Sequence, residues 1–147
     1  MKKVLFVCTG NTCRSVMAEK IFNHLAKKKK LKLKAESAGI YANEGSGVSQ
    51  NTIKALKKLG IRNIKHKSVQ FCLDNLFNYD YCIALTSDIK NYIGKFENVF
   101  CFQDFIAGST DVSDPYMKGD SEYFLTANQI KEYVEKLIDV IGEEEWK

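Results

Sequence analysis

The sequence has no long hydrophobic run. None of its apolar stretches approaches the roughly 20 residues that a membrane-spanning helix needs, so we expect no membrane association. The first stretch, residues 4–7, follows two lysines but ends at Cys8, which makes it too short for a secretory signal peptide. We therefore expect a cytoplasmic protein.

Arginine is scarce. Only Arg14 and Arg62 occur among 22 basic residues, which face 18 acidic residues and leave a net charge of +4. Proteins that bind nucleic acid over a broad surface are more basic and use more arginine, because a guanidinium can hold a phosphate by two hydrogen bonds. The sequence therefore predicts no nucleic-acid partner, and the position of each arginine becomes informative.

The spacing of the cysteines excludes two further classes of protein. The five cysteines are odd in number and follow no metal-ligand pattern such as Cys-x2-Cys. We expect no bound metal and no disulfide framework, and the missing secretion signal indicates a reducing compartment. Three of them lie at apolar positions and are predicted to be inert core residues: Cys72, Cys82 and Cys101.

Hydrophobic residues alternate between strand-like and helix-like spacing. Short apolar or alternating runs predict strands at residues 4–7, 31–35, 81–85 and 99–102. Apolar residues at helical spacing, or a capping residue, predict helices within residues 17–25, 53–59, 86–94 and 130–141. We therefore expect one α/β domain over residues 1–147, with a four-stranded parallel sheet and helices on both faces.

Ligands of a parallel sheet bind at the carboxyl ends of its strands, which directs attention to the segment after the first strand. This segment, here called the anion loop, consists of Cys8, Thr9, Gly10, Asn11, Thr12, Cys13, Arg14 and Ser15. Gly10 and Asn11 tolerate a positive φ, which lets backbone N–H groups converge on one anion. The following helix adds its N-terminal N–H groups, and Arg14 adds a fork suited to phosphate oxygens. The loop therefore predicts a phosphate site.

Cys8 lies at the base of the anion loop. A helix N-terminus and a nearby arginine stabilise a thiolate, so we expect Cys8 to be ionised and directed at the bound anion. A thiolate beside a phosphate predicts phosphoryl transfer to sulfur, which produces a phosphocysteine. The nucleotide-binding pattern Gly-x4-Gly-Lys-[Ser/Thr] is absent.

The leaving group of such a reaction also needs a proton. A carboxylic acid on a mobile loop can supply it and can later act as the base for water. The polar stretch of residues 103–119 is here called the acid loop. It contains three candidate acids, and the residue that follows it is a fourth: Asp104, Asp111, Asp114 and Asp120. Spacing alone does not choose among them, although Pro115 restricts the backbone of Asp114 to extended geometry.

Residues 4–19 resemble the signature of the low-molecular-weight protein tyrosine phosphatase family. The resemblance covers nearly the whole chain, because it includes Ser37-Ala38-Gly39, His66-Lys67-Ser68 and Asp114-Pro115-Tyr116. It implies a four-stranded parallel sheet flanked by helices, and hydrolysis of phosphorylated protein side chains to inorganic phosphate without a metal or cofactor.

The resemblance also implies residue roles. Cys8 matches the nucleophile, Arg14 the phosphate clamp and Asp114 the general acid. Ser15 matches the hydroxyl that stabilises the thiolate, and the hydrogen bonds that hold the loop are matched by Asn11, Ser37 and His66. We expect the substrate to contact the loop residues Thr9 to Cys13 and Ser15, together with Tyr41 and Tyr116.

Cys13 has two interpretations. It is a small side chain lining the loop, or, as the resemblance supports, a resolving thiol that forms a reversible disulfide with oxidised Cys8.

The substrate class depends on Thr12. Tyrosine-specific members of the family usually carry isoleucine there, whereas threonine resembles the protein arginine phosphatase branch, as do residues 108–115. A threonine hydroxyl can hydrogen-bond a guanidinium, whose N–H groups an isoleucine would leave unpaired. We therefore expect a protein arginine phosphatase, with a protein tyrosine phosphatase as the alternative.

Two other interpretations are less favoured. An arsenate reductase on this scaffold needs two further redox cysteines close in sequence, and the segment after Cys82 has no second one. A catalytically inactive phosphate-binding module would have lost Cys8, Arg14 or the acid, and all three are present.

Overall fold

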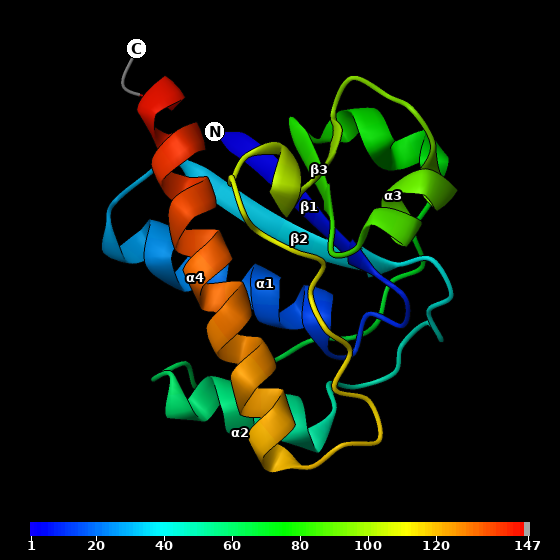
Figure 1. Ribbon diagram of the computed structural model, residues 1–147, viewed down its shortest axis with the longest axis vertical. Helices are drawn as coiled ribbons and strands as arrows, with labels where there is room; N and C mark the ends of the chain where they lie inside the picture. The colour runs from blue at the N-terminus through cyan, green and yellow to red at the C-terminus, as the bar shows by residue number, and fades with distance from the viewer. Residues whose placement is uncertain (146–147) are drawn as a thin grey trace.

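A parallel sheet of four strands runs through the structure, a computed structural model that describes residues 1–145. Its order is β2-β1-β3-β4 (Figure 1). The strands are β1 (Lys2–Cys8), β2 (Leu33–Gly39), β3 (Tyr81–Ala84) and β4 (Val99–Cys101). The middle of β1 is apolar on both faces and is buried from Val4 to Cys8, as a central strand covered on two sides requires.

The helices cover the sheet in two groups. Helix α1 (Arg14–Lys28) packs on β1 and β2, and α4 (Asp120–Glu145) runs beside α1 and α2 (Gln50–Lys58) (Figure 1). Helix α3 (Ser87–Ile93) contacts β3 and β4. The connection from β1 leads to one edge of the sheet and that from β3 to the other. Right-handed crossovers therefore put α1 and α3 on opposite faces.

This strand order opens a crevice between β1 and β3. Their connections leave in opposite directions, and such a switch point is where parallel sheets bind ligands, beyond the carboxyl ends of the strands. Cys8 is the last residue of β1. The acid loop reaches the same end, because the Val112 N–H donates to the Leu85 carbonyl that follows β3, at 3.0 Å. The anion loop and the acid loop therefore meet over this crevice.

Aromatic packing holds β1 in place. Phe6 is completely buried, and its ring centroid lies 5.8 Å from that of Phe22 on α1 and 6.1 Å from that of Phe102 after β4. Burying a side chain of this size contributes about 1.5–3 kcal/mol. The strand that carries Cys8 is therefore fixed to both neighbouring segments.

Most of the predicted elements are confirmed, with several differences. The fourth strand ends at Cys101 rather than residue 102, because Phe102 begins a short 3₁₀ helix (Phe102–Asp104). The second strand begins at Leu33 rather than residue 31, because the Leu31 N–H is used by the end of α1, where it donates to the Ala26 carbonyl at 2.9 Å. Helix α4 begins at Asp120 rather than residue 130, since acidic side chains in its first turn favour the helix N-terminus. A 3₁₀ helix, Leu73–Asn78, was not predicted at all.

Other expectations can be compared directly. Cys82 and Cys101 are buried as predicted, but the prediction for Cys72 is wrong because its side chain is exposed beside the 3₁₀ helix. In the described part of the chain, no helix has the length and apolar character to span a bilayer. Residues 146–147 of the predicted domain lie outside the described residues.

Candidate active site

The anion loop leaves β1 at Cys8 and enters α1 at Arg14. Asn11 adopts the left-handed conformation with φ of 58°, as expected for its residue type. Gly10 does not, so the expectation that both residues need a positive φ is wrong for Gly10. One left-handed residue is enough to turn the loop, because the side chain of Asn11 fixes the turn from within.

Asn11 is completely buried, and both polar atoms of its side chain are paired. Its Nδ2 donates to Ser15 Oγ at 2.8 Å and to Ser37 Oγ at 2.9 Å, and its Oδ1 accepts from the Val69 N–H at 2.9 Å. His66 Nε2 lies 3.0 Å from the Asn11 carbonyl and 3.1 Å from Oδ1; since both are acceptors, Nε2 carries a proton. The four partners come from α1, β2 and residues 66–69, which tie the loop to three segments.

Strand β2 supports the loop through close backbone contact. The Ile40 N–H donates to the Cys8 carbonyl at 3.0 Å, and the Tyr41 N–H donates to the Thr9 carbonyl at 2.9 Å. A Cβ atom on Gly39 would lie 2.5 Å from the Thr9 carbonyl oxygen. Only glycine therefore allows this approach, which gives the Ser37-Ala38-Gly39 motif a physical reason.

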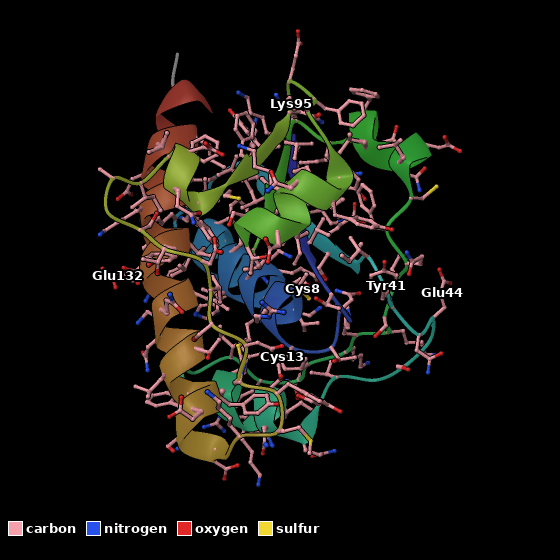
Figure 2. The ribbon with its side chains drawn as sticks, turned by 45° about the vertical axis from the view of Figure 1, so that its right-hand side comes forward. Cys8, Cys13, Tyr41, Glu44, Lys95 and Glu132 are labelled. Atoms are coloured by element: carbon pink, nitrogen blue, oxygen red, sulfur yellow. The ribbon has the colours of Figure 1, made fainter. Side chains whose placement is uncertain are left out.

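The sulfur of Cys8 is buried beside a hydroxyl group and a helix N-terminus. The side chain is 3% exposed, and Sγ lies 2.9 Å from Ser15 Oγ. Because Asn11 already donates to Ser15 Oγ, the hydroxyl hydrogen of Ser15 is free to point at the sulfur. The N-terminus of α1 begins nearby at Arg14. Figure 2 labels Cys8 and Cys13 on the anion loop. A hydroxyl donor and a helix N-terminus both stabilise negative charge on sulfur.

Arg14 joins the anion loop to the acid loop. Its guanidinium is nearly buried; Nη1 donates to the Val112 carbonyl at 3.3 Å, and Nη2 lies 3.6 Å from Asp114 Oδ2. Asp114 is about half exposed (56%), and its Oδ1 accepts from the Tyr116 N–H at 3.0 Å. The carboxylate of Asp114 is thus held at the rim of the anion loop, next to the cation.

A cavity of about 320 Å³ lies over the anion loop. Its wall consists of the loop from Cys8 to Arg14 together with Ser49, Asp114, Tyr116 and Tyr123. Ser15 lies beneath this wall, against the sulfur, rather than in it.

Tyr41 does not line the cavity. Its side chain is 68% exposed, and its ring centroid lies 5.8 Å from that of Tyr92 on α3. Figure 2 shows Tyr41 to one side of the anion loop. Its backbone, not its ring, contacts the loop.

Ser49 and Tyr123 were not predicted as site residues. Ser49 is the N-cap of α2, where its Oγ accepts from the Thr52 N–H at 3.2 Å, and the pattern Ser-x-x-Thr before a predicted helix was a usable signal. Tyr123 carried no such signal, because it precedes residue 130, where the predicted helix begins.

Three of the four candidate acids have other partners. Asp111 accepts from the Ser87 N–H at 2.9 Å and from Gln103 Nε2 at 2.7 Å. Burial alone would raise the pKa of Asp111, but these hydrogen bonds, first that of Gln103, hold it below its usual value. The Asp111 carboxylate therefore stays ionised and anchors the acid loop to α3. Asp120, at the start of α4, lies 3.7 Å from Lys54 Nζ.

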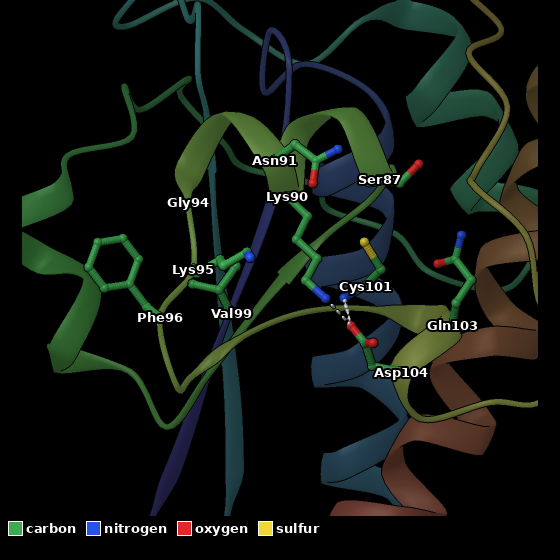
Figure 3. A pocket seen from close by; sticks show the side chains of 10 residues that line it. All are labelled: Ser87, Lys90, Asn91, Gly94, Lys95, Phe96, Val99, Cys101, Gln103 and Asp104. Atoms are coloured by element: carbon green, nitrogen blue, oxygen red, sulfur yellow. Dashed lines mark hydrogen bonds and ion pairs between the residues drawn. The ribbon is translucent and has the colours of Figure 1, made fainter.

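Asp104 belongs to a second, larger cavity of about 620 Å³ beside α3 and β4. Figure 3 shows Asp104 bound to Lys90, whose Nζ lies 2.9 Å from Oδ2, with Cys101 in the wall. Burial, foremost, raises the pKa of the Cys101 thiol to about 11. In this second cavity the thiol is protonated and Asp104 is already paired with Lys90. Of these two acids, only Asp114 lines the cavity that contains Cys8.

The remaining thiols of interest are protonated at neutral pH. Burial raises the pKa of Cys13 to about 12, although hydrogen bonding to Thr52 and the charge of Arg14 act in the opposite direction. Burial also raises the pKa of Cys82 to about 12. Neither is joined in a disulfide. Among residues 1–145, no cluster of His, Cys, Asp and Glu side chains is arranged to hold a metal ion.

Comparison with known proteins places this geometry in a family context. The family described as low molecular weight phosphotyrosine protein phosphatase matches residues 3–147. The chain is 31% identical to the protein-arginine-phosphatase of Bacillus subtilis, over 91% of this chain and 93% of that protein. It is 39% identical to the low molecular weight protein-tyrosine-phosphatase YfkJ of the same organism, over 83% of this chain and 85% of that protein.

A solved structure is also similar. It is the YwlE arginine phosphatase, in a cysteine-to-serine mutant with a phosphorylated active-site serine. It superposes with a TM-score of 0.87 and 28% identity, over 95% of each chain.

Proposed function

The chain belongs to the low molecular weight phosphotyrosine protein phosphatase family, and we propose that this cysteine-dependent protein phosphatase removes phosphate from phosphoarginine in proteins. The observation that carries the chemistry is the position of Cys8 at the base of a phosphate-sized loop, 2.9 Å from a serine hydroxyl and beside a helix N-terminus. The phosphorylated serine in the similar mutant structure supports a phosphorylated enzyme as the intermediate.

In the first step, Cys8 Sγ attacks phosphorus while the phosphate oxygens accept hydrogen bonds from the loop N–H groups and Arg14. The S–P bond forms as the P–N bond of phosphoarginine breaks, and the carboxyl group of Asp114 gives its proton to the leaving guanidine nitrogen. The Ser15 hydroxyl donates a hydrogen bond to the sulfur and stabilises negative charge on it. It therefore helps the sulfur to act as the leaving group when phosphocysteine is hydrolysed. Asn11, Ser37 and His66 hold the loop in the shape that receives the phosphate.

In the second step, water attacks the phosphorus of phosphocysteine. The Asp114 carboxylate takes a proton from that water, the S–P bond breaks, and inorganic phosphate leaves with Cys8 again a thiolate. Asp114 suits both steps because it is exposed enough to exchange protons and lines the cavity, whereas Asp111 is held ionised by its hydrogen bonds.

The preference for phosphoarginine rests on Thr12, which lines the cavity and presents a hydroxyl where a tyrosine-specific enzyme usually has an aliphatic side chain. Guanidinium N–H groups that lose water on binding need acceptors, and a site that supplies them can favour its substrate by several kcal/mol. Tyr41, which was expected to contact the substrate, lies outside the cavity, so its ring is not placed to flank the aryl group of a phosphotyrosine.

Phosphotyrosine is the second candidate. The observation in its favour is Tyr116, whose exposed ring lines the cavity and can stack on a phenyl group. The identity to YfkJ, a protein-tyrosine-phosphatase by name, is also higher than that to the arginine phosphatase.

The decisive experiment measures kcat/KM for two peptides that differ only in carrying phosphoarginine or phosphotyrosine. We expect the phosphoarginine peptide to be preferred by about 100-fold, equivalent to roughly 2.7 kcal/mol of transition-state stabilisation. A preference for phosphotyrosine would assign the enzyme to the second candidate and would leave the Cys8 mechanism intact.

The chemistry of the cysteines also bears on the compartment in which the enzyme works. A thiolate nucleophile and unpaired cysteines are compatible with a reducing compartment, so we also propose that the enzyme works in the cytoplasm, on phosphorylated proteins and without nucleic acid or metal.

A further inference from the structure

The carbonyl group of Thr12 in the anion loop is bonded to helix α2. It accepts two hydrogen bonds there, from the Ser49 N–H at 3.2 Å and from Thr52 Oγ1 at 3.4 Å. Ser49 is the N-cap of α2, and Thr52 lies in the first turn of that helix. The side chain of Thr52 is completely buried, although it is polar. A buried hydroxyl needs hydrogen-bond partners, and the anion loop supplies one of them.

The hydroxyl groups of Ser49 and Thr52 donate in a fixed direction. Ser49 Oγ lies 2.6 Å from Thr52 Oγ1. A hydroxyl has one hydrogen, and a carbonyl oxygen only accepts. Both contacts of Thr52 Oγ1 are therefore made only if Thr52 donates to the Thr12 carbonyl and Ser49 donates to Thr52. Ser49 Oγ also accepts from the Thr52 N–H at 3.2 Å, which agrees with this direction.

The consequence concerns the backbone N–H of the next residue, Cys13. The Thr12 carbonyl and the Cys13 N–H belong to one peptide group, which is planar and trans, so they point in opposite directions. A carbonyl held against α2 therefore turns the Cys13 N–H toward the interior of the anion loop. Among residues 1–145 this N–H has no acceptor, and Cys13 lines the active-site cavity.

The other side of the anion loop is supported in the same way by a different segment. The Thr9 carbonyl accepts from the Tyr41 N–H, which follows β2, at 2.9 Å. The Gly10 N–H, which shares that peptide group, is therefore also turned inward. N–H groups that converge in this way form a site for an anion. Backbone after β2 thus directs one N–H of the loop, and α2 directs another.

We propose that Thr52 is a positioning residue for catalysis: by holding the Thr12 carbonyl, it directs the Cys13 N–H at an oxygen of the bound phosphate. This inference rests on the proposed function, in which the anion loop holds the phosphate. An N–H that is already aimed at the phosphate stabilises its charge without the cost of reorienting a peptide group. The hydrogen bond from Ser49 comes from its backbone, so Thr52 makes the contribution that depends on a side chain.

The test is the substitution Thr52→Val, which nearly keeps the shape of the buried side chain and removes its hydroxyl. We expect the inhibition constant of inorganic phosphate to rise about three- to tenfold, as the loss of one hydrogen bond predicts. The value of kcat/KM should fall by a similar factor for the phosphoarginine and phosphotyrosine peptides, because both carry the same phosphate.

Two control variants separate the hydroxyl from packing. Thr52→Ser keeps the hydroxyl and loses the buried methyl group, so it should lower Tm yet match the wild type in phosphate inhibition. Thr126→Val makes the same change as Thr52→Val at a buried threonine of α4 that does not line the cavity, and it should also match the wild type. An equal rise of the inhibition constant in Thr52→Val and Thr52→Ser would assign the effect to packing and overturn the proposal.

A spectroscopic measurement tests the direction of the N–H itself. Saturating inorganic phosphate should move the amide-proton NMR signals of Gly10 and Cys13 downfield in the wild type. In Thr52→Val the shift of Cys13 should become smaller, whereas Gly10, whose peptide group is held by Tyr41, should keep its shift. An undiminished Cys13 shift overturns the proposal.

The remaining outcomes separate the role of Thr52 from the function beneath it. Unchanged phosphate inhibition in Thr52→Val overturns the role of Thr52 while the phosphatase activity stands. If Thr52→Val does not fold, Thr52→Ala replaces it, with the same expected rise of the inhibition constant and the same meaning if none occurs. A wild-type enzyme that hydrolyses neither peptide overturns the proposed function, and the NMR titration with phosphate still decides whether Thr52 directs the Cys13 N–H.

Discussion

Gly39 lies where the anion loop passes closest to β2, and replacing it with alanine tests whether that contact shapes the loop. The new Cβ would lie 2.5 Å from the Thr9 carbonyl oxygen and 2.9 Å from the Asn11 nitrogen. Both are backbone atoms, which cannot turn away as a flexible side chain would. The loop must therefore shift by several tenths of an ångström.

The size of the effect can be worked from this clash. Inserting one methyl group into a packed region costs about 1–3 kcal/mol, which for a domain of this size lowers Tm by roughly 3–10 °C. The catalytic loss should be larger than the loss of stability suggests, because a misplacement of about 1 Å in a catalytic group can reduce the rate about 100-fold. We expect a decrease of that order in kcat/KM for Gly39→Ala, together with weaker inhibition by inorganic phosphate.

The control for this assay is an alanine substitution at a glycine where an added Cβ would touch no other atom. Gly47 is suitable, because its added Cβ would meet no atom within 4 Å and its φ is not left-handed. Thermal unfolding and phosphate inhibition are measured for Gly39→Ala and Gly47→Ala side by side. Matching Tm and matching phosphate inhibition in the two variants would refute the idea that β2 shapes the anion loop.

Three further substitutions test the proposed roles. Cys8→Ser should abolish turnover yet keep phosphate binding, measured by calorimetry; retained turnover would contradict the nucleophile assignment. Asp114→Asn should slow hydrolysis by about 10²–10⁴, whereas an equal loss in Asp111→Asn alone would move the acid to that residue. Thr12→Ile should shift the kcat/KM ratio from phosphoarginine toward phosphotyrosine, and an unchanged ratio would show that the wall hydroxyl at this position does not select the substrate.

The order of strands and helices could be predicted because it depends on local patterns. Residues 4–7 are apolar without interruption, and Met17 to Leu25 repeat at helical spacing, so each segment specifies its element without distant partners. The boundaries were less predictable. Leu31 was assigned to a strand for its alternation with lysines, but its backbone N–H caps the end of α1, a local contact that alternation does not reveal.

The anion loop was predictable for a related reason: the residues that bind the anion follow one another in the sequence. Cys8, Arg14 and the N-terminus of α1 lie within seven consecutive residues. Their residue types alone therefore indicate an anion site. Asn11 shows the limit of this reasoning. Its residue type indicates a positive φ, but its pairing with Ser37 and His66 depends on segments brought together only by the fold.

The distant wall of the site was not predicted, because no local pattern shows that its residues meet over the anion loop. Tyr123 and Ser49 belong to different helices far apart in the sequence, and each has an ordinary local explanation, one as an amphipathic helix residue and the other as an N-cap. They line one cavity only when α4 packs on α2. The anion loop and its Thr12 are therefore readable in one short segment, whereas the part of the cavity wall formed by Ser49 and Tyr123 is assembled only by the packing of α4 on α2.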